Sequence, residues 1–211
     1  MALATNARFI TLEGLEGAGK STAMAFARDW FEARGETVVC TREPGGTPLA
    51  EELRGVLKAV RDEVVAPSTE LLLMFAARAQ HVERVIRPAL AEGKVVICDR
   101  FTDSTRAYQG AGRGLSMQVI EQLAGIAHAD CNPGLTLWLD VPVALGLERA
   151  AAREAADRFE QEALDFFERT RGGFEALAEA EPERVRRIDA TRPLAEVQAA
   201  VESILEARHG G

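Results

Sequence analysis

The sequence predicts an α/β fold built on a doubly wound, five-stranded parallel sheet. Short β-rich runs alternate with longer helical patterns, the order typical of a parallel sheet that is covered on both faces. A glycine-rich loop also separates the first strand-like run from the first helix-like segment. The chain has 211 residues and 47% hydrophobic content, enough for one large core. We therefore expect a single domain over residues 1–211.

The elements follow one another in a regular order. The expected strands are the runs RFITLE, ETVVCT, KVVICDR, GLTLWLDV and RVRRIDA. The expected helices cover residues 20–34, 68–91, 116–128, 143–154 and 193–208. In the helix from Ser68 to Ala91, apolar side chains recur at three- and four-residue steps, which predicts one buried stripe that packs on the sheet. The stripe consists of Leu72, Phe75, Ala79, Val82, Ile86 and Leu90.

Charge and cysteine usage narrow the class of protein. A formal net charge of −8 and a pI near 5.1 argue against a broad basic surface for nucleic acid or an anionic membrane. Cys40, Cys98 and Cys131 lack C-x-x-C pairing, so neither a disulfide framework nor a zinc site is indicated. Cys40 and Cys98 lie in strand-like runs, and we expect both thiols to be buried. No segment reads as a signal peptide or a membrane span, so we expect a cytoplasmic protein.

The loop GLEGAGKST, from Gly14 to Thr22, fits the pattern G-x-x-x-x-G-K-[ST] in full. Between a strand and a helix, its glycines let successive N–H groups point at a phosphate, and the helix N-terminus adds its positive dipole end. We expect ATP to bind here, with Lys20 bridging β- and γ-phosphate oxygens and the Ser21 hydroxyl binding Mg²⁺. The expected ATP-binding residues of the loop are Gly14, Gly17, Ala18, Gly19, Lys20, Ser21 and Thr22.

Asp99 and Arg100 end the apolar run KVVIC, at the sheet edge where open α/β folds bind ligands. Arg100 can fork onto a monophosphate, and Asp99 can hold a metal ion directly or through water. The structural alternative is an ion pair that merely ends the strand. The position at the carboxyl end of a strand favours the functional interpretation.

Three stretches, TREPGGTPLAEELR, LLLMFAARAQH and CDRFTDSTRAYQGAGRG, indicate the second substrate. Together with GLEGAGKST and DRFEQEALDFFERTR, they resemble the thymidylate kinases, which phosphorylate dTMP to dTDP in dTTP synthesis. The resemblance extends from about Phe9 to Leu205. It implies a P-loop nucleoside monophosphate kinase fold with a lid over about residues 149–160. It also implies ATP and dTMP as substrates, Mg²⁺ as cofactor and a homodimer.

The resemblance assigns roles around the nucleotide acceptor. Ser104 and Thr105 would face the nucleotide. Tyr108 would fill the space of a ribose 2′-hydroxyl, and Gln109 would contact the base. The alternative for Ser104 and Thr105 is that they are polar surface residues at a helix start. The positions of Glu43 and Arg54 also match family positions near the acceptor. The segment Asp189–Thr191 resembles the region beside adenine.

Arg78 matches the family arginine that bonds the thymine carbonyl. In the family, an aromatic residue one turn before this arginine stacks on the base. Many relatives have phenylalanine at that position, where this chain has Met74. The next residue in this chain is Phe75. Both lie about one helical turn from Arg78. We favour Phe75 as the stacking residue, with Met74 in the floor of the site. The alternative is that Phe75 is a core residue, since it lies on the apolar stripe.

Glu16 lies inside the phosphate loop and would point to the 3′-hydroxyl of dTMP or to metal-bound water. Some relatives carry an arginine in this loop, and this chain does not, so a cation for the transferred phosphoryl group would come from the lid. In the lid we expect Arg153 to act in catalysis and Arg149 to lie on the adenine side, with Arg158 nearby. The alternative is that Arg149 and Arg153 lie on a solvated helix face. The expected catalytic residues are Lys20, Arg100, Arg153, Asp99 and Glu16.

Two rival functions stay open. A kinase for another deoxynucleotide or for a nucleoside would share the phosphate loop and the Asp-Arg pair, and Arg78 and Tyr108 argue against it. A nucleotide-dependent switch belongs to another class, and such proteins usually carry a guanine-reading N-K-x-D motif, which this sequence lacks.

Overall fold

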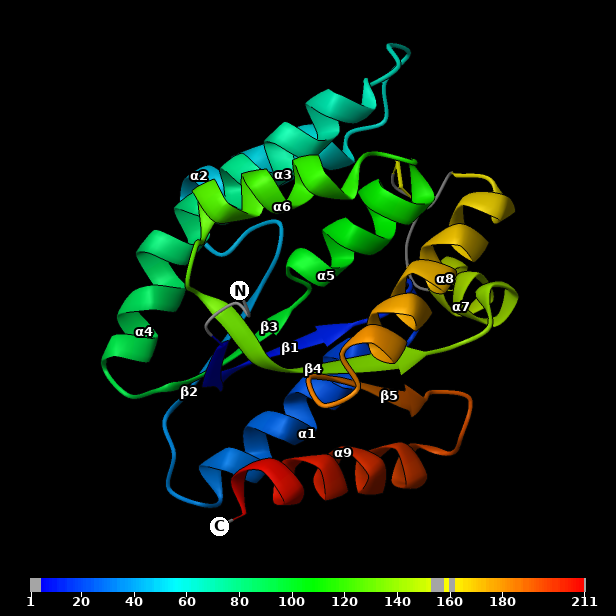
Figure 1. Cartoon of the computed structure of the whole chain (residues 1–211). Coiled ribbons are helices and arrows are strands. Elements are labelled where there is room, and N and C mark those ends of the chain that lie inside the picture. The colour runs from blue at the N-terminus through cyan, green and yellow to red at the C-terminus, as the bar shows by residue number, and fades with distance from the viewer. Residues whose placement is uncertain (1–4, 153–157, 160–161, 211) are drawn as a thin grey trace.

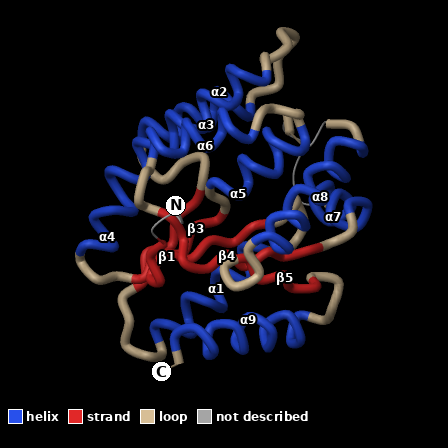
Figure 2. Tube along the Cα trace, viewed as in Figure 1, coloured by secondary structure: helices blue, strands red, loops and turns tan. Residues whose placement is uncertain are grey.

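The computed structural model describes residues 5–152, 158–159 and 162–210. Their strands form one five-stranded sheet in the order β2-β3-β1-β4-β5, with every neighbouring pair parallel. The strands are β1 (Thr5–Glu13), β2 (Val38–Arg42), β3 (Val95–Asp99), β4 (Asn132–Asp140) and β5 (Val185–Asp189). The expected doubly wound parallel sheet is confirmed (Figures 1 and 2).

Helices lie on both sides of this sheet (Figure 1). On one side lie α1 (Lys20–Glu32) and α9 (Leu194–His209). The other helical elements are α2 (Pro48–Lys58), α3 (Pro67–His81), α4 (Arg87–Ala91), α5 (Thr102–Thr105), α6 (Met117–Ala127), α7 (Val143–Ala151) and α8 (Leu164–Ala180), with the π-helical segments η1 (Val82–Ile86) and η2 (Arg106–Gly112). In the described residues, no helix is long and apolar enough to cross a membrane.

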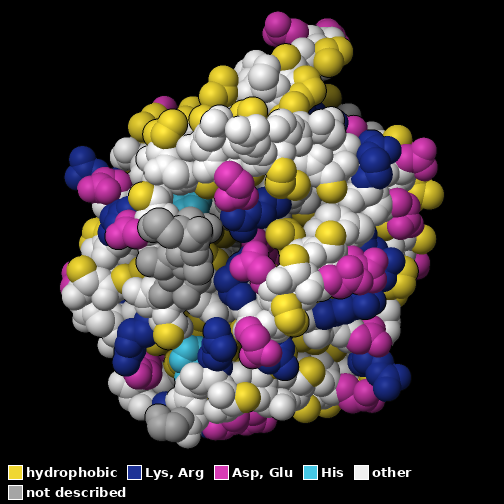
Figure 3. Space-filling view, in the orientation of Figure 1, with side chains coloured by type: hydrophobic (Ala, Val, Ile, Leu, Met, Phe, Trp, Pro, Cys, Tyr) yellow, Lys and Arg dark blue, Asp and Glu magenta, His cyan; other side chains and the backbone are white. Residues whose placement is uncertain are grey.

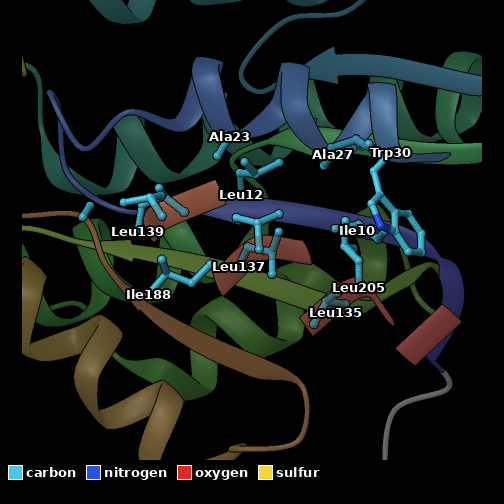
Figure 4. Close-up of a cluster of buried hydrophobic side chains, with 14 of the residues drawn as sticks. Ile10, Leu12, Ala23, Ala27, Trp30, Leu135, Leu137, Leu139, Ile188 and Leu205 are labelled. Atoms are coloured by element: carbon cyan, nitrogen blue, oxygen red, sulfur yellow. The ribbon is translucent and has the colours of Figure 1, made fainter. Parts of the chain in front are cut away.

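The main core lies between the sheet and the helices α1 and α9 (Figure 4). Side chains of β1, β4 and β5 meet Ala23, Ala27 and Trp30 of α1 and Leu205 of α9. Strand β4 is buried along its whole length, because it lies between β1 and β5 and has packed side chains on both faces. Each fully buried aliphatic side chain stabilises the fold by about 1.5–3 kcal/mol. This layer of side chains thereby fixes the strand ends that carry the phosphate loop.

A second core cluster lies on the opposite face and fixes η2. Trp138 of β4 packs with Phe166, Phe167 and Phe174 of α8, and Tyr108 of η2 belongs to the same cluster. Helix α8 was not among the expected helices, although its aromatic residues recur at helical spacing. Helix α2 was not expected either; its start signals are Pro48 in the first turn and Thr47, whose Oγ1 accepts a hydrogen bond from the Ala50 amide at 3.2 Å.

The segment expected as one long helix is divided into α3, η1 and α4. Pro88 lacks an N–H and cannot continue the regular hydrogen-bond ladder, and the wider π turns of η1 lie directly before α4. The apolar stripe was wrong at Leu72, which is 57% exposed, whereas Leu71 is buried. The reason is that α3 packs on α2 and α6 rather than flat on the sheet, so another face of the helix is covered.

The three cysteines are free, and Cys98 and Cys131 are buried. The expectation that Cys40 is buried was wrong, because its thiol is exposed. Strand β2 is an edge strand, and Cys40 lines an open pocket there instead of packing beneath a helix.

Candidate active site

The phosphate loop joins β1 to α1 and requires glycine at two close approaches. Gly14 has φ +136°, and a Cβ there would lie 2.3 Å from the Leu139 carbonyl oxygen. Gly17 has φ +72°, and a Cβ there would lie 2.0 Å from the Gly146 carbonyl oxygen. Larger residues would force the loop away from β4 and α7. Glycine is therefore needed both for the backbone angles and for the packing of the loop.

Lys20 begins α1 and is buried, with Nζ inside the curve of the loop. Nζ donates hydrogen bonds to the carbonyl oxygens of Gly14 at 3.2 Å and Leu15 at 2.9 Å. Burial lowers the pKa of Lys20 to about 8, and the positive charge of Arg100 acts in the same direction. An anion that binds in the loop would favour the charged form of Lys20 and so counteract both effects on its pKa.

Two adjoining pockets meet at this loop. The wider pocket, of about 670 Å³, is lined by loop residues and by Asp99 at the end of β3. Of the expected ATP-binding set, the lining includes Gly17, Gly19, Lys20 and Ser21. Gly14, Ala18 and Thr22 are not among the lining residues; Ala18 lies in the main core and Thr22 is exposed.

The narrower pocket, of about 100 Å³, lies between α3, η2 and the segment after β3. Its wall includes the expected acceptor residues Arg78, Ser104, Thr105, Tyr108 and Gln109. Glu16, Arg54, Lys58 and Arg100 line both pockets. A phosphate in one pocket and a phosphate in the other would therefore share the same charged boundary.

Arg100 is one of the residues on that boundary. Its φ of +69° is rare for a residue with a side chain, and such backbone strain gathers at functional sites. One guanidinium nitrogen donates to the Ser104 hydroxyl at 3.1 Å. The other donates to Glu16 at 2.9 Å and to the Tyr108 hydroxyl at 3.1 Å. These bonds hold a cation, which can bind a phosphate with two N–H groups, between the two pockets.

Tyr108 completes this arrangement from η2. Its hydroxyl donates to the Glu16 carboxylate, with oxygen distances of 2.8 and 3.0 Å. Burial raises the pKa of Tyr108 well above its ordinary value, so the hydroxyl stays protonated and remains a donor. Glu16, Arg100 and Tyr108 thus come from three different elements and meet at one point.

Arg78 is held on the wall of the narrow pocket by a buried ion pair. Its Nε donates to Glu43 at 2.6 Å, and a terminal nitrogen donates to the Thr105 hydroxyl at 3.0 Å. His81 lies 2.9 Å from the other Glu43 oxygen through Nδ1. Burial alone would raise the pKa of Glu43, but Arg78 and His81 reverse this effect and lower it. The sequence indicated Glu43 only as a position near the acceptor and did not indicate His81.

Met74, and not Phe75, lines the narrow pocket. Phe75 packs with Leu71 of α3 and with Ile120 and Ala124 of α6. The preference for Phe75 as the stacking residue is therefore corrected by this geometry. Neighbouring positions on a helix point about 100° apart, so only one of the two can face the pocket while the other faces α6.

The wider pocket also has donors for a divalent cation. Asp99 Oδ1 is buried and has no hydrogen-bond partner among the described residues. The Ser21 hydroxyl and the Asp99 carboxylate line the same pocket. In the described part of the chain, no cluster of three or more His, Cys, Asp or Glu residues gathers into a metal cage. Mg²⁺ fits such a site, because it keeps water and phosphate ligands and needs only one or two protein oxygens.

The lid arginines are described in part. Arg149 on α7 donates to the Ala190 carbonyl oxygen at 3.1 Å, which brings it to the segment Asp189–Thr191. Arg153 lies outside the described residues. Arg158 donates from Nε to the Leu57 carbonyl oxygen at 2.8 Å, and its guanidinium stacks on Phe159. Phe159 lines the narrow pocket, so this end of the lid reaches the acceptor side.

Known proteins resemble this chain over nearly its whole length. A sequence model of the family described as thymidylate kinase matches residues 12–201. The chain is 56% identical to the thymidylate kinase of Teredinibacter turnerae, covering 95% of this chain and 98% of that protein. It is 57% identical to that of Pseudomonas fluorescens strain Pf0-1, covering 93% and 94%. The solved thymidylate kinase of Ehrlichia chaffeensis superposes with a TM-score of 0.75 at 35% identity, covering 93% and 97%. The chain belongs to the thymidylate kinase family.

Proposed function

We infer that this protein transfers a phosphoryl group from ATP to dTMP and so forms dTDP. Thymidylate kinase relatives match nearly the whole chain, which is the basis for the reaction. The observation that carries the assignment in the molecule itself is the pair of adjoining pockets, with Arg100 and Glu16 on their common boundary. One pocket includes the phosphate loop, and the other is lined by Arg78, which Glu43 holds in place.

We propose that the phosphates of ATP lie on the loop amides and on Lys20, and that the acceptor phosphate lies on Arg100. The bond from the γ-phosphorus to its bridging oxygen breaks as an oxygen of the acceptor phosphate bonds to that phosphorus. This transfer needs positioning and cations more than an acid or a nucleophile. Lys20 and Arg100 supply two of these cations. Arg149 would lie on the adenine side, and Arg153 is the proposed lid cation at the transferred group.

Ser21 and Asp99 are the proposed ligands of Mg²⁺. Asp99 is the stronger of the two assignments, because its buried Oδ1 has no hydrogen-bond partner among the described residues. When bound, Mg²⁺ would neutralise charge on the phosphate oxygens. Asp99 would hold the ion directly or through water.

The narrow pocket is the proposed site of the thymidine part of dTMP. Arg78 would donate to a thymine carbonyl, and Met74 would pack on the base. Ser104 and Thr105 would line the deoxyribose side, with Glu16 near the 3′-hydroxyl. Tyr108 already bonds Glu16 and Arg100, so its ring and hydroxyl bound the space beside the sugar. A ribose 2′-hydroxyl would have to compete for this space.

The reaction is tested by measuring ADP formation with Mg-ATP and a panel of acceptors: dTMP, dUMP, UMP, dCMP, dGMP and thymidine. We expect the highest kcat/KM with dTMP. A higher value with another acceptor would keep the phosphate loop and remove the base assignments. Steady ATP hydrolysis that no acceptor stimulates would instead favour the nucleotide switch.

We also propose that the protein is a homodimer. Hydrophobic side chains gather on the outer face over α2 and α3 in Figure 3. Beyond α3, the neighbouring helix α6 exposes Met117, Val119 and Ile126, and Ile126 is 82% exposed. Sedimentation velocity is expected to give a dimer for the parent and a monomer for Ile126→Asp. A monomeric parent would refute this assembly.

A further inference from the structure

Glu70 is a fully buried carboxylate on α3 to which no step above assigns a role. It is not among the residues that line either pocket. Its Oε1 accepts a hydrogen bond from Gln109 Nε2 at 2.8 Å. The guanidinium groups of Arg113 and Arg158 lie 3.1 and 2.7 Å from its Oε2. One carboxylate thus joins the base pocket, η2 and the lid end.

The two arginines keep Glu70 ionised. Burial alone would raise the pKa of Glu70, but the hydrogen bonds from Arg113 and Gln109 and the ion pair with Arg158 overcome this effect and lower it. An ionised carboxylate has only acceptor oxygens. Both carboxylate oxygens of Glu70 can therefore only accept hydrogen bonds from their neighbours.

This fixed direction determines which way the Gln109 amide points. A glutamine side chain has an NH₂ donor on one side and a carbonyl acceptor on the other, and rotation by 180° exchanges them. Facing Glu70, only the NH₂ orientation avoids two acceptors in contact. The Gln109 carbonyl oxygen, Oε1, is then the polar atom left for the pocket, and no donor to it occurs among the described residues.

We propose that Glu70 is a positioning residue for base specificity, holding Gln109 so that its carbonyl accepts a hydrogen bond from the ring N–H of a thymine or uracil base. Cytosine has an acceptor nitrogen at the corresponding ring position. The Gln109 carbonyl oxygen would then face a second acceptor, and no hydrogen bond could form between them. Leaving such buried groups unpaired costs far more than losing one favourable contact. The inference rests on the proposed function, because it assumes a pyrimidine monophosphate in the narrow pocket.

Glu70→Gln tests the proposal directly. A glutamine at this position can either donate or accept, so the Gln109 amide becomes free to turn over. We expect the ratio of kcat/KM for dTMP to that for dCMP to fall about 10-fold or more. If turnover of dCMP is too slow to measure, its competitive inhibition constant against dTMP replaces it. Far-UV circular dichroism and the melting temperature report whether the variant folds.

Two further variants make the outcome decisive. Glu162→Gln removes a carboxylate that pairs with Arg113 at 2.6 Å, and Glu162 does not bond Gln109; its selectivity should equal that of the parent. Glu70→Asp keeps an acceptor-only carboxylate, so its dTMP:dCMP ratio should stay within about threefold of the parent even if overall activity falls. An unchanged ratio in folded Glu70→Gln, or a ratio that collapses in Glu70→Asp, would overturn the proposal. A parent without dTMP activity would instead refute the proposed function.

Discussion

At the scale of single residues, the site depends on side chains that hold one another before any ligand arrives. Glu16, Arg100 and Tyr108 form a closed set of hydrogen bonds between the two pockets. Hydrogen bonds to charged groups are stronger than neutral ones, so each member limits the freedom of the other two. Such preorganisation lowers the cost of orienting the acceptor phosphate.

Replacing Tyr108 with phenylalanine tests this coupling. Tyr108→Phe keeps the ring against Phe166 and Phe174 but removes the hydroxyl that bridges Glu16 and Arg100. The lost bonds involve charged partners, and each is worth about 1.5–3 kcal/mol. We expect kcat/KM for dTMP to fall about 10-fold or more. Parental activity in a folded variant would show that the hydroxyl has no part in positioning Arg100.

The lowered pKa of Lys20 predicts that proton uptake accompanies ATP binding. In the free protein the pKa is about 8, so above pH 8 a large share of Lys20 is neutral. A bound phosphate favours the charged form and raises this pKa, and the complex then holds more protons than the free protein. Titration calorimetry at about pH 9, in buffers of different ionisation enthalpy, should show uptake that Lys20→Met abolishes. Equal uptake in both proteins would contradict the assignment.

At the scale of elements, the phosphate loop depends on how closely β4 and α7 approach it. Part of this requirement is local, because Gly17 has a positive φ. The other part comes from α7, whose Gly146 carbonyl leaves no room for a Cβ at position 17. The two contributions can be separated, because the chain contains a glycine with a similar φ and no near neighbour.

That matched position is Gly35, which has φ +81° and where an added Cβ would meet no atom within 4 Å. Gly35→Ala should lower the free energy of unfolding by about 1–2 kcal/mol, the cost of left-handed backbone strain. Gly17→Ala adds a clash with α7 and should cost at least about 1 kcal/mol more, with loss of ATP binding. Denaturant unfolding and nucleotide titration measure both. Equal costs for the two variants would show that α7 yields readily.

At the scale of the whole molecule, two core clusters share one sheet. Trp30 lies in the cluster beneath α1, and Trp138 lies in the aromatic cluster beneath α8. Strand β4 contributes to both, since Leu137 and Trp138 are neighbours on opposite faces. We therefore propose that the chain is one domain that unfolds as one cooperative unit.

Single-tryptophan variants test this proposal. Trp138→Phe leaves the fluorescence of Trp30, and Trp30→Phe leaves that of Trp138. For each variant, the fluorescence midpoint in urea should coincide with its far-UV circular dichroism midpoint. Separate transitions within either variant would indicate that the two faces of the sheet unfold independently.

The sequence by itself determined the phosphate loop, the five strands and most of the helices between them, although α2 and α8 were missed. These features are local: glycine spacing, apolar runs and helical periodicity act over a few neighbouring residues. The five strands were accordingly predicted within a few residues of their observed bounds. The family resemblance added the acceptor residues, among which Arg78, Ser104, Thr105, Tyr108 and Gln109 line one pocket together with Glu16, Glu43 and Arg54.

Only the tertiary structure decided which side of each helix is covered and which distant carboxylates hold the site. The choice between Met74 and Phe75 depends on where α6 packs against α3, and the exposure of Leu72 has the same cause. Glu70 and Gln109 are 39 positions apart, and no short pattern links them. Their pairing arises because α3 and η2 meet in space, where a buried charge must find partners. Local sequence shapes each element, and the contacts between elements determine what each side chain can do.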